Sequence, residues 1–430
     1  MKKYFIIAAA AIVAMAACSK VETDNTPGRK ISFEVGSYSA QTKADPATTS
    51  SIRTETNDAF KSKAWLHANG EAGTDFFGVA VANGTDATSY VETVSYLTAS
   101  STWEPELEYF WPKGAGSYIN FVSWFATNGK NPSTISETAM NWGTDAAPMT
   151  IATNDNFLFA DEAWRYRDNV STYGHDSVEK GVPTLFHHAL AKVAFNVRLS
   201  TVTASTKSVW DVDIQTVELK VANNGFLALV NEDPNANKTN PWGLGEAYDA
   251  DDVDTHATSD NIGWTRPSTG ATLETIVEAG GTGTEEFVAV QFSDFKPTTA
   301  TSSAPNTSGA FQTLLAERTV MPQAIDGGEV TFKMTFYIRI FHADNEGNKA
   351  EFNGTTGITD DDAFSTELIT VEGNLHDIVG AIDNWKMNTK YIYNVTIDPV
   401  GRKVLFDPAV VDWAPTVSAE QEIYNASSTD

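Results

Sequence analysis

The sequence predicts an all-β protein that folds into two antiparallel β-sandwich domains. Apolar and aromatic residues alternate with polar ones in many short runs, which is typical of half-buried strands. Clusters of Gly, Pro, Asn and Ser separate these runs. Long helical periodicity is absent, and only residues 375–382 are expected to form a short helix. The strands fall into two series, which favours two sandwiches.

The two series of strands flank a polar stretch at residues 173–183. The first series is expected at 31–35, 76–81, 90–96, 107–111, 118–125 and 157–159. The second is expected at 184–186, 191–199, 217–221, 226–230, 287–292, 319–321, 330–341, 391–397 and 403–413. Residues 39–59 show no periodicity. We therefore expect domains at 31–180 and 181–430, the second ending in a tail at 414–430.

The sequence of the N-terminal segment predicts that the protein is exported. Lys2 and Lys3 precede an apolar run too short for a membrane span, which needs about 20 apolar residues. The run ends in Met15-Ala16-Ala17-Cys18, which resembles a bacterial lipobox, and Cys18 is the only cysteine. We expect a lipoprotein signal peptide at residues 1–17, acylation of Cys18 into outer-membrane lipid, and a tether at 18–30. The alternative is an ordinary signal peptide with an incidental cysteine.

Composition and motifs exclude several classes of function. The chain carries 29 Lys and Arg against 56 Asp and Glu, so its net charge of −27 repels nucleic acid. No nucleophile elbow, zinc-protease helix, phosphate loop or dinucleotide fingerprint is present. The acidic runs at 248–254 and 360–362 lack EF-hand spacing, and His187 and His188 would face opposite sides of a strand. We expect no enzyme, no cofactor and no metal site.

Several segments occur in a fixed order behind the lipobox. They are Thr42-Lys43-Ala44, Trp103 with 109–112, 119–124, 157–160, 186–193, 390–397 and Val411-Asp412-Trp413. In this order they resemble the fimbrillins, the Bacteroidetes pilin lipoproteins that include the major and minor fimbrial subunits and the Mfa-like group. The resemblance covers nearly the whole chain, but the expected loops at 231–285 and 343–383 match nothing in the family.

The resemblance implies transthyretin-like sandwiches and a surface protein that assembles into fimbriae for adhesion. It also implies that a trypsin-like maturation protease removes the first strand, at 31–38, in which Ile31, Phe33 and Val35 share one face. Arg53 is the first expected position of the cut and Lys43 the second. Losing such an edge strand would uncover apolar pockets, which a donor strand from another fimbrial subunit could refill in a homo- or hetero-polymer.

The resemblance implies that the donor strand is the C-terminal tail. There Val417, Ala419 and Ile423 share a strand face, but Gln421 shares it too. Shaft, tip and anchor roles therefore all stay open. Ser177, in Asp176-Ser177-Val178, also resembles the short acceptor motif for O-glycosylation in Bacteroidetes.

A surface glycan-binding lipoprotein is the alternative function. It predicts exposed aromatic platforms for sugar rings in the large loops, with Trp242, Trp264 and Trp385 as the candidates.

Overall fold

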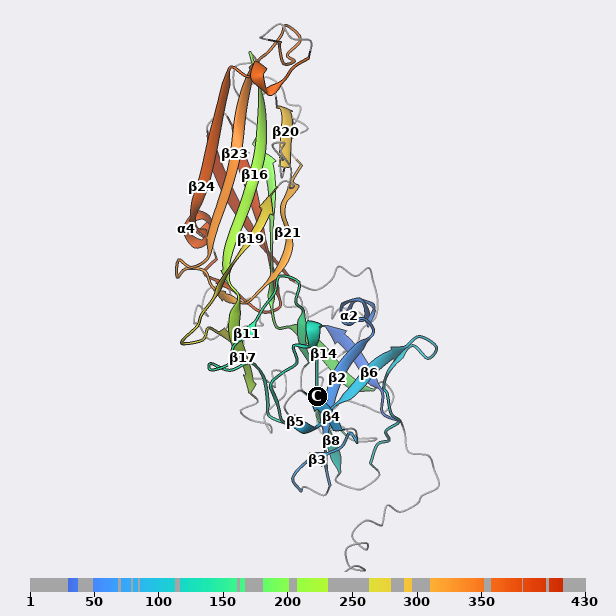
Figure 1. Ribbon diagram of the computed structural model, residues 1–430. Coiled ribbons are helices and arrows are strands. Elements are labelled where there is room, and N and C mark those ends of the chain that lie inside the picture. The colour runs from blue at the N-terminus through green and yellow to red at the C-terminus, as the bar shows by residue number, and fades with distance from the viewer. Residues whose placement is uncertain are drawn as a thin grey trace, which may run out of the picture.

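The computed structural model confirms the all-β class and shows two lobes, a long β-sandwich lobe and a barrel lobe (Figure 1). It describes residues 30–37, 49–68, 71–78, 80–83, 86–112, 117–160, 163–166, 181–200, 207–230, 263–279, 290–295, 310–351, 357–380, 382–399 and 402–412. The transthyretin-like topology and the domain boundary stay predictions.

The barrel lobe contains a sheet that closes on itself. Its strands, in order across the sheet, are β13 (Ala163–Tyr166), β8 (Tyr118–Ala126), β12 (Phe157–Ala160), β14 (Val182–His188), β1 (Phe33–Ser37), β7 (Thr102–Pro105), β6 (Glu92–Leu97), β2 (Ala59–His67) and β3 (Thr74–Asp75). Because β8 also pairs with β2, the strands from β8 to β2 form a closed seven-stranded ring. Alternate side chains point into the ring, so its interior is a packed core.

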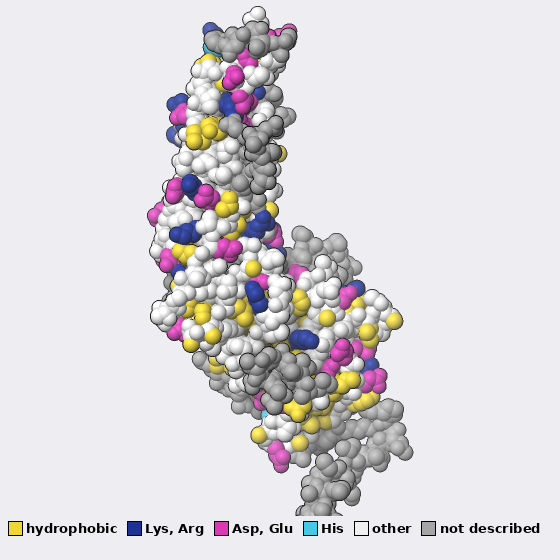
Figure 2. Space-filling model, in the orientation of Figure 1, with side chains coloured by type: hydrophobic (Ala, Val, Ile, Leu, Met, Phe, Trp, Pro, Cys, Tyr) yellow, Lys and Arg dark blue, Asp and Glu magenta, His cyan; other side chains and the backbone are white. Residues whose placement is uncertain are grey.

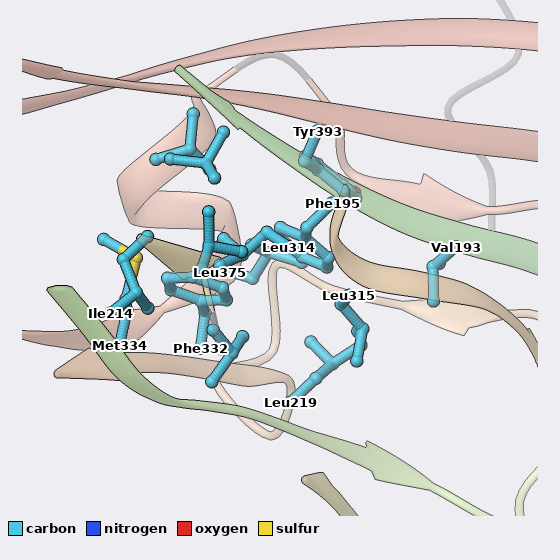
Figure 3. Close-up of a cluster of buried hydrophobic side chains, with 14 of the residues drawn as sticks. Val193, Phe195, Ile214, Leu219, Leu314, Leu315, Phe332, Met334, Leu375 and Tyr393 are labelled. Atoms are coloured by element: carbon cyan, nitrogen blue, oxygen red, sulfur yellow. The ribbon is translucent and has the colours of Figure 1, made fainter. Parts of the chain in front are cut away.

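The sandwich lobe contains two sheets that face each other across one core. One sheet consists of β19 (Leu273–Ala279), β16 (Ser208–Ala222), β23 (Thr331–His342) and β24 (Ser365–Asn374), with β20 (Val290–Phe295) also on β16. The other consists of β21 (Gln312–Val320), β15 (Ala191–Leu199), β26 (Thr389–Asp398) and β27 (Lys403–Asp412). Figure 3 shows the core, where Phe195 stacks on Phe332 at 4.9 Å and on Tyr393 at 4.7 Å between ring centroids.

A third set of buried side chains joins the two lobes. The small sheet at this junction consists of β11 (Met149–Thr150), β17 (Asn224–Val230), β10 (Ala139–Trp142) and β9 (Thr134–Ile135), with β18 (Trp264–Thr265) on β17. Two further two-stranded sheets are the hairpin of β4 (Ala80–Asn83) with β5 (Asp86–Tyr90) and the long-range pair of β22 (Gln323–Ala324) with β25 (Asn384–Trp385). The chain passes from β14 in one lobe to β15 in the other through Ala189 and Leu190, both buried in this junction.

The described helices are short. They are α2 (Thr49–Thr56), α4 (Leu375–Val379) and the 3₁₀ turns η1 (Thr127–Gly129) and η5 (Asp360–Asp362). The helix expected at 375–382 is confirmed by α4, which Asn374 caps and Gly380 ends in a left-handed conformation.

Four sequence expectations are wrong. Residues 107–111 form only an isolated bridge through Phe110, because the ring takes its strand from β7 just before them. The segments expected as large loops contain β18, β19 and β24, and the irregular stretch 39–59 contains α2. In the expected strand 76–81, residues 76–78 are not in a strand. Finally, two pairings are parallel rather than antiparallel, those of β1 with β14 and of β15 with β26, because long connections bring these strands together.

Candidate functional site

Strand β1 is the candidate site, and it is one of the seven strands that form the closed ring, between β14 and β7. It runs parallel to β14, with Phe33 opposite Val182, and antiparallel to β7, with Phe33 opposite Trp103. The Ile31 N–H donates to the Tyr109 carbonyl at 2.8 Å, and the Val182 N–H donates to the carbonyl of the residue before Phe33 at 2.7 Å. The expectation of an edge strand is therefore wrong, because β1 has a neighbour on each side.

The three predicted side chains of β1 all lie in the barrel core. Ile31, Phe33 and Val35 are 0%, 3% and 1% exposed. The Phe33 ring meets Phe60 at 5.6 Å and Phe121 at 5.7 Å between centroids, both edge-to-face. Such aromatic pairs add about 0.5–1.5 kcal/mol beyond the burial of area. We call the three buried sites that Ile31, Phe33 and Val35 fill sockets, and the Phe33 socket is lined by aromatic rings.

A glycine lets β14 approach this strand. Gly181, just before β14, has a φ of +100°, and a Cβ built there would lie 2.9 Å from the Ser32 carbonyl oxygen. Any other residue at position 181 would be strained and would push against the backbone of β1. Sequence reasoning missed Gly181, because the polar stretch around it gives no sign of what it packs against.

Two carboxylates hold the start of β1 by charge. Lys30 Nζ lies 2.6 Å from Glu104 Oε2 and 3.2 Å from Glu108 Oε1. The hydrogen bond to Glu104 raises the pKa of Lys30, and the bond from Lys30 lowers the pKa of Glu104. Glu104 is the more enclosed partner, with 15% of its side chain exposed against 69% for Glu108. Sequence alone could not pair Lys30 with either, because strand neighbours depend on tertiary pairing.

Helix α2 carries the first expected cleavage position and lies against β1. Arg53 Nε is 2.7 Å from Asp58 Oδ1, and its guanidinium lies 3.9 Å from the Tyr96 ring centroid. The hydrogen bond to Asp58 is the largest cause of the raised pKa of Arg53. Ile52, one residue earlier, is 0% exposed and belongs to the barrel core. The peptide bond after Arg53 is thus helical, and a protease would have to unwind α2 to reach it.

A largely buried pair also holds the last turn of α2. Glu55 Oε2 is 3.3 Å from His188 Nε2 at the end of β14, and the Asn156 amide donates to the same oxygen at 3.3 Å. Burial raises the pKa of Glu55 and lowers that of His188 well below its usual value. Both shifts favour the uncharged forms. The pair ties α2 to a strand that is a direct neighbour of β1.

Several predicted positions lie outside the described residues. These are Cys18 with its signal peptide, Lys43, Ser177, Trp242 and the tail positions Val417, Ala419 and Ile423. The structure therefore brings together the strand Ile31, Phe33 and Val35 with Arg53 and leaves the rest as predictions. The described part of the chain contains no helix long and apolar enough to cross a membrane.

The expected sugar platforms within the described residues are wrong. Trp264 is 6% exposed, and its indole N–H donates to the Ala189 carbonyl at 2.6 Å. Trp385 is 0% exposed and donates to the Tyr393 hydroxyl at 2.8 Å. Both residues lie next to irregular sequence, and for that reason the sequence predicts them to be exposed. Instead, both are buried in hydrophobic cores.

In the described part of the chain, neither acidic side chains nor potential metal ligands gather into one site. Figure 2 shows acidic side chains spread along both lobes. Groups of three or more His, Cys, Asp or Glu that could hold a metal ion are absent from the described residues. In the acidic run 360–362, Asp362 is buried and accepts hydrogen bonds from Thr359, so it caps a turn.

Solved structures that resemble this chain include fimbrial proteins and putative cell adhesion proteins of Bacteroidetes. One is a fimbrial protein from Bacteroides vulgatus, which matches at 14% identity and a TM-score of 0.48, over 90% of this chain and 99% of that one. Another is a fimbrilin from Porphyromonas gingivalis, at 10% identity and a TM-score of 0.33, over 90% and 98%. No protein-family model matches, and no curated protein matches. Because these TM-scores lie below 0.5, we take the function from this chain's own residues.

Proposed function

We propose that this chain is a structural subunit of a surface fimbria, shaft or tip, which supports adhesion and has no enzymatic activity. It is exported as a lipoprotein through Cys18 and matured by a trypsin-like protease. The ordered family motifs behind the lipobox support this proposal. The observation that carries it is the position of β1: the first described strand of the chain fills the middle of a closed sheet.

That position gives strand removal a direct consequence. Without residues 31–37, β14 and β7 would face each other across a gap with unpaired backbone groups. Three sockets would open into the core, each worth roughly 1.5–3 kcal/mol when filled. A strand from another subunit would regain both the backbone hydrogen bonds and the burial. Contacts of this head-to-tail kind extend into a filament.

The two expected cuts would leave different gaps. A cut after Arg53 leaves Ile52 on the same fragment as β1, so the core loses a fourth buried side chain when that fragment is displaced. A cut after Lys43 leaves α2 in place, with Glu55 still against His188. In both cases β1 stays held by its two neighbours until it is displaced, so cleavage makes exchange possible but does not itself empty the groove.

The test is the N-terminus and mass of the protein on intact cells, with and without an inhibitor of trypsin-like proteases. The proposal expects a start just after Arg53 or Lys43, abolished by the inhibitor. Arg53→Gln and Lys43→Gln variants identify the cut, and Lys61→Gln serves as the control because Lys61 lies within β2. If residues 31–35 stay attached to the surface protein in every case, assembly by strand exchange is ruled out.

A further inference from the structure

We propose that the β1 groove, the space between β14 and β7 that residues 31–35 fill, accepts a strand from a different subunit rather than this chain's own tail. The strand that fits it carries a basic residue, followed at alternate positions by an apolar, an aromatic and an aliphatic side chain. This inference rests on the proposed function and names the partner of the same site.

The central socket sets the strongest requirement. Phe33 is enclosed by Phe60 and Phe121, and it sits opposite the buried Trp103 in the neighbouring strand. A small side chain there would leave the Phe60 and Phe121 rings without contact on one side, and a polar one would lose its hydrogen bonds to water. The flanking sockets of Ile31 and Val35 are equally dry, but they hold only aliphatic groups.

Charge adds a second requirement at the entrance. Glu104 and Glu108 both reach Lys30, the residue just before the first socket. Once Lys30 leaves with β1, these two carboxylates face the incoming strand. A basic residue at that register restores the pair, and an acidic one is repelled. The backbone contacts at Ile31 and Ser32, by contrast, can be made by any strand.

The chain's own tail meets neither requirement. Residues 414–430 contain Glu420 and Glu422 but no Lys or Arg. Their one aromatic residue is Tyr424, and two positions before it stands Glu422, which would occupy a dry socket. No register of the face that carries Val417, Ala419 and Ile423 places an aromatic residue at the centre. The groove and the tail of this chain are therefore mismatched, which favours a hetero-polymer.

A strand-exchange assay tests this. The full chain receives a site-specific protease recognition sequence between residues 38 and 48 and a fluorophore on the N-terminal side. After cleavage the labelled fragment is challenged with synthetic peptides, and its release is followed by anisotropy. The peptides are residues 29–38, the same peptide with Ser32→Ala, Phe33→Ala or Lys30→Glu, and residues 414–430.

The proposal expects exchange with the 29–38 peptide and equal exchange with its Ser32→Ala control. Phe33→Ala should weaken competition by more than about 100-fold, from the usual cost of emptying a phenylalanine site. Lys30→Glu should weaken it by about threefold to tenfold, with the difference shrinking at high salt. The tail peptide should not compete.

Two other outcomes overturn the inference, and they are distinguishable. If the tail peptide competes as well as the 29–38 peptide, the occupant is another copy of this chain and only the inference fails. If no peptide displaces the fragment, the groove does not exchange strands, and the inference fails together with the assembly mechanism.

Discussion

The barrel core and the sandwich core are both built of buried aromatic and aliphatic side chains, but they draw on the sequence differently. The buried side chains of the sandwich core all come from residues 191–397, most of them from strands of that lobe (Figure 3). The barrel core takes Ile31, Phe33 and Val35 from one strand near the start of the described chain. One cut can therefore separate the barrel from a strand of its ring, while the sandwich keeps every strand.

Deleting residues 30–37 should give the largest difference between the lobes. The free energy of unfolding of the barrel should fall by roughly 5–9 kcal/mol, because three fully buried side chains that contribute about 1.5–3 kcal/mol each are removed. Hydrogen exchange should then accelerate in β7 and β14 and stay slow in β15 and β26. The matched variant Phe195→Ala should accelerate exchange in the sandwich instead, for a loss of about 3–5 kcal/mol. Uniform acceleration in both lobes after the deletion would show that their stabilities are not separate.

Gly181→Ala should destabilise the barrel by pushing β14 away from β1. The matched control is Gly357→Ala, because Gly357 has a similar φ of +110° but open space around its Cβ. Backbone strain should cost both variants about 1–3 kcal/mol. Only Gly181→Ala should lose about 1–3 kcal/mol of further folding stability, because its added methyl group clashes with the Ser32 carbonyl. Equal urea midpoints for the two variants would remove the close approach as the reason for this glycine.

His188 should make the stability of the barrel depend on pH. Its pKa is lowered by burial, so the folded state stays neutral where the unfolded chain binds a proton. Stability from this residue is therefore lost as the pH falls below about 6.5, at no more than about 1.4 kcal/mol per pH unit. Urea unfolding at pH 7 and pH 5 should show a smaller pH effect in His188→Gln than in the parent chain. An unchanged slope would mean that His188 is charged in the folded protein.

Lys30→Ala should have the smallest effect, about 0.2–1 kcal/mol, because its ion pairs are partly exposed. Lys333→Ala in the sandwich lobe is the control, since Lys333 lies 3.9 Å from Glu218 in a looser pair. Thermal unfolding at low and high salt should show a salt-sensitive loss for Lys30→Ala and a smaller one for Lys333→Ala. Equal losses of stability would indicate that the ion pairs of Lys30 do not stabilise the first strand more than an ordinary surface pair does.

Strong alternation made much of the fold predictable. In β15 and β23, buried and half-exposed positions alternate almost without interruption, and both strands lie where the sequence places them. Strand β24 was missed because its outward face carries Leu368 at 55% exposure while Glu367 stands on the inner one, so the pattern is diluted. Helix α2 was missed because Ile52 is its one apolar side chain in the core.

The candidate site was predictable in its residues but not in its surroundings. Ile31, Phe33 and Val35 alternate, and all three are buried as the pattern indicates. Alternation reports which face of a strand is covered, and that face is the same for an edge strand and for a strand inside a barrel. The neighbours of β1, and with them Gly181, depend on pairings between residues far apart in the chain, Phe33 with Trp103 and with Val182, which the sequence pattern does not record.

The pairing of Phe33 with Val182 also sets an order of events during synthesis. Among the described strands, β1 is the first to be made, but its parallel partner β14 is the last strand of the ring to follow. Contacts between such distant residues form slowly, because a long loop must close before they bring any gain. We therefore expect β1, the first strand of the ring to be synthesised, to be the last to pair with its neighbours. A newly made chain would pass through the same open-sided shape that maturation later recreates.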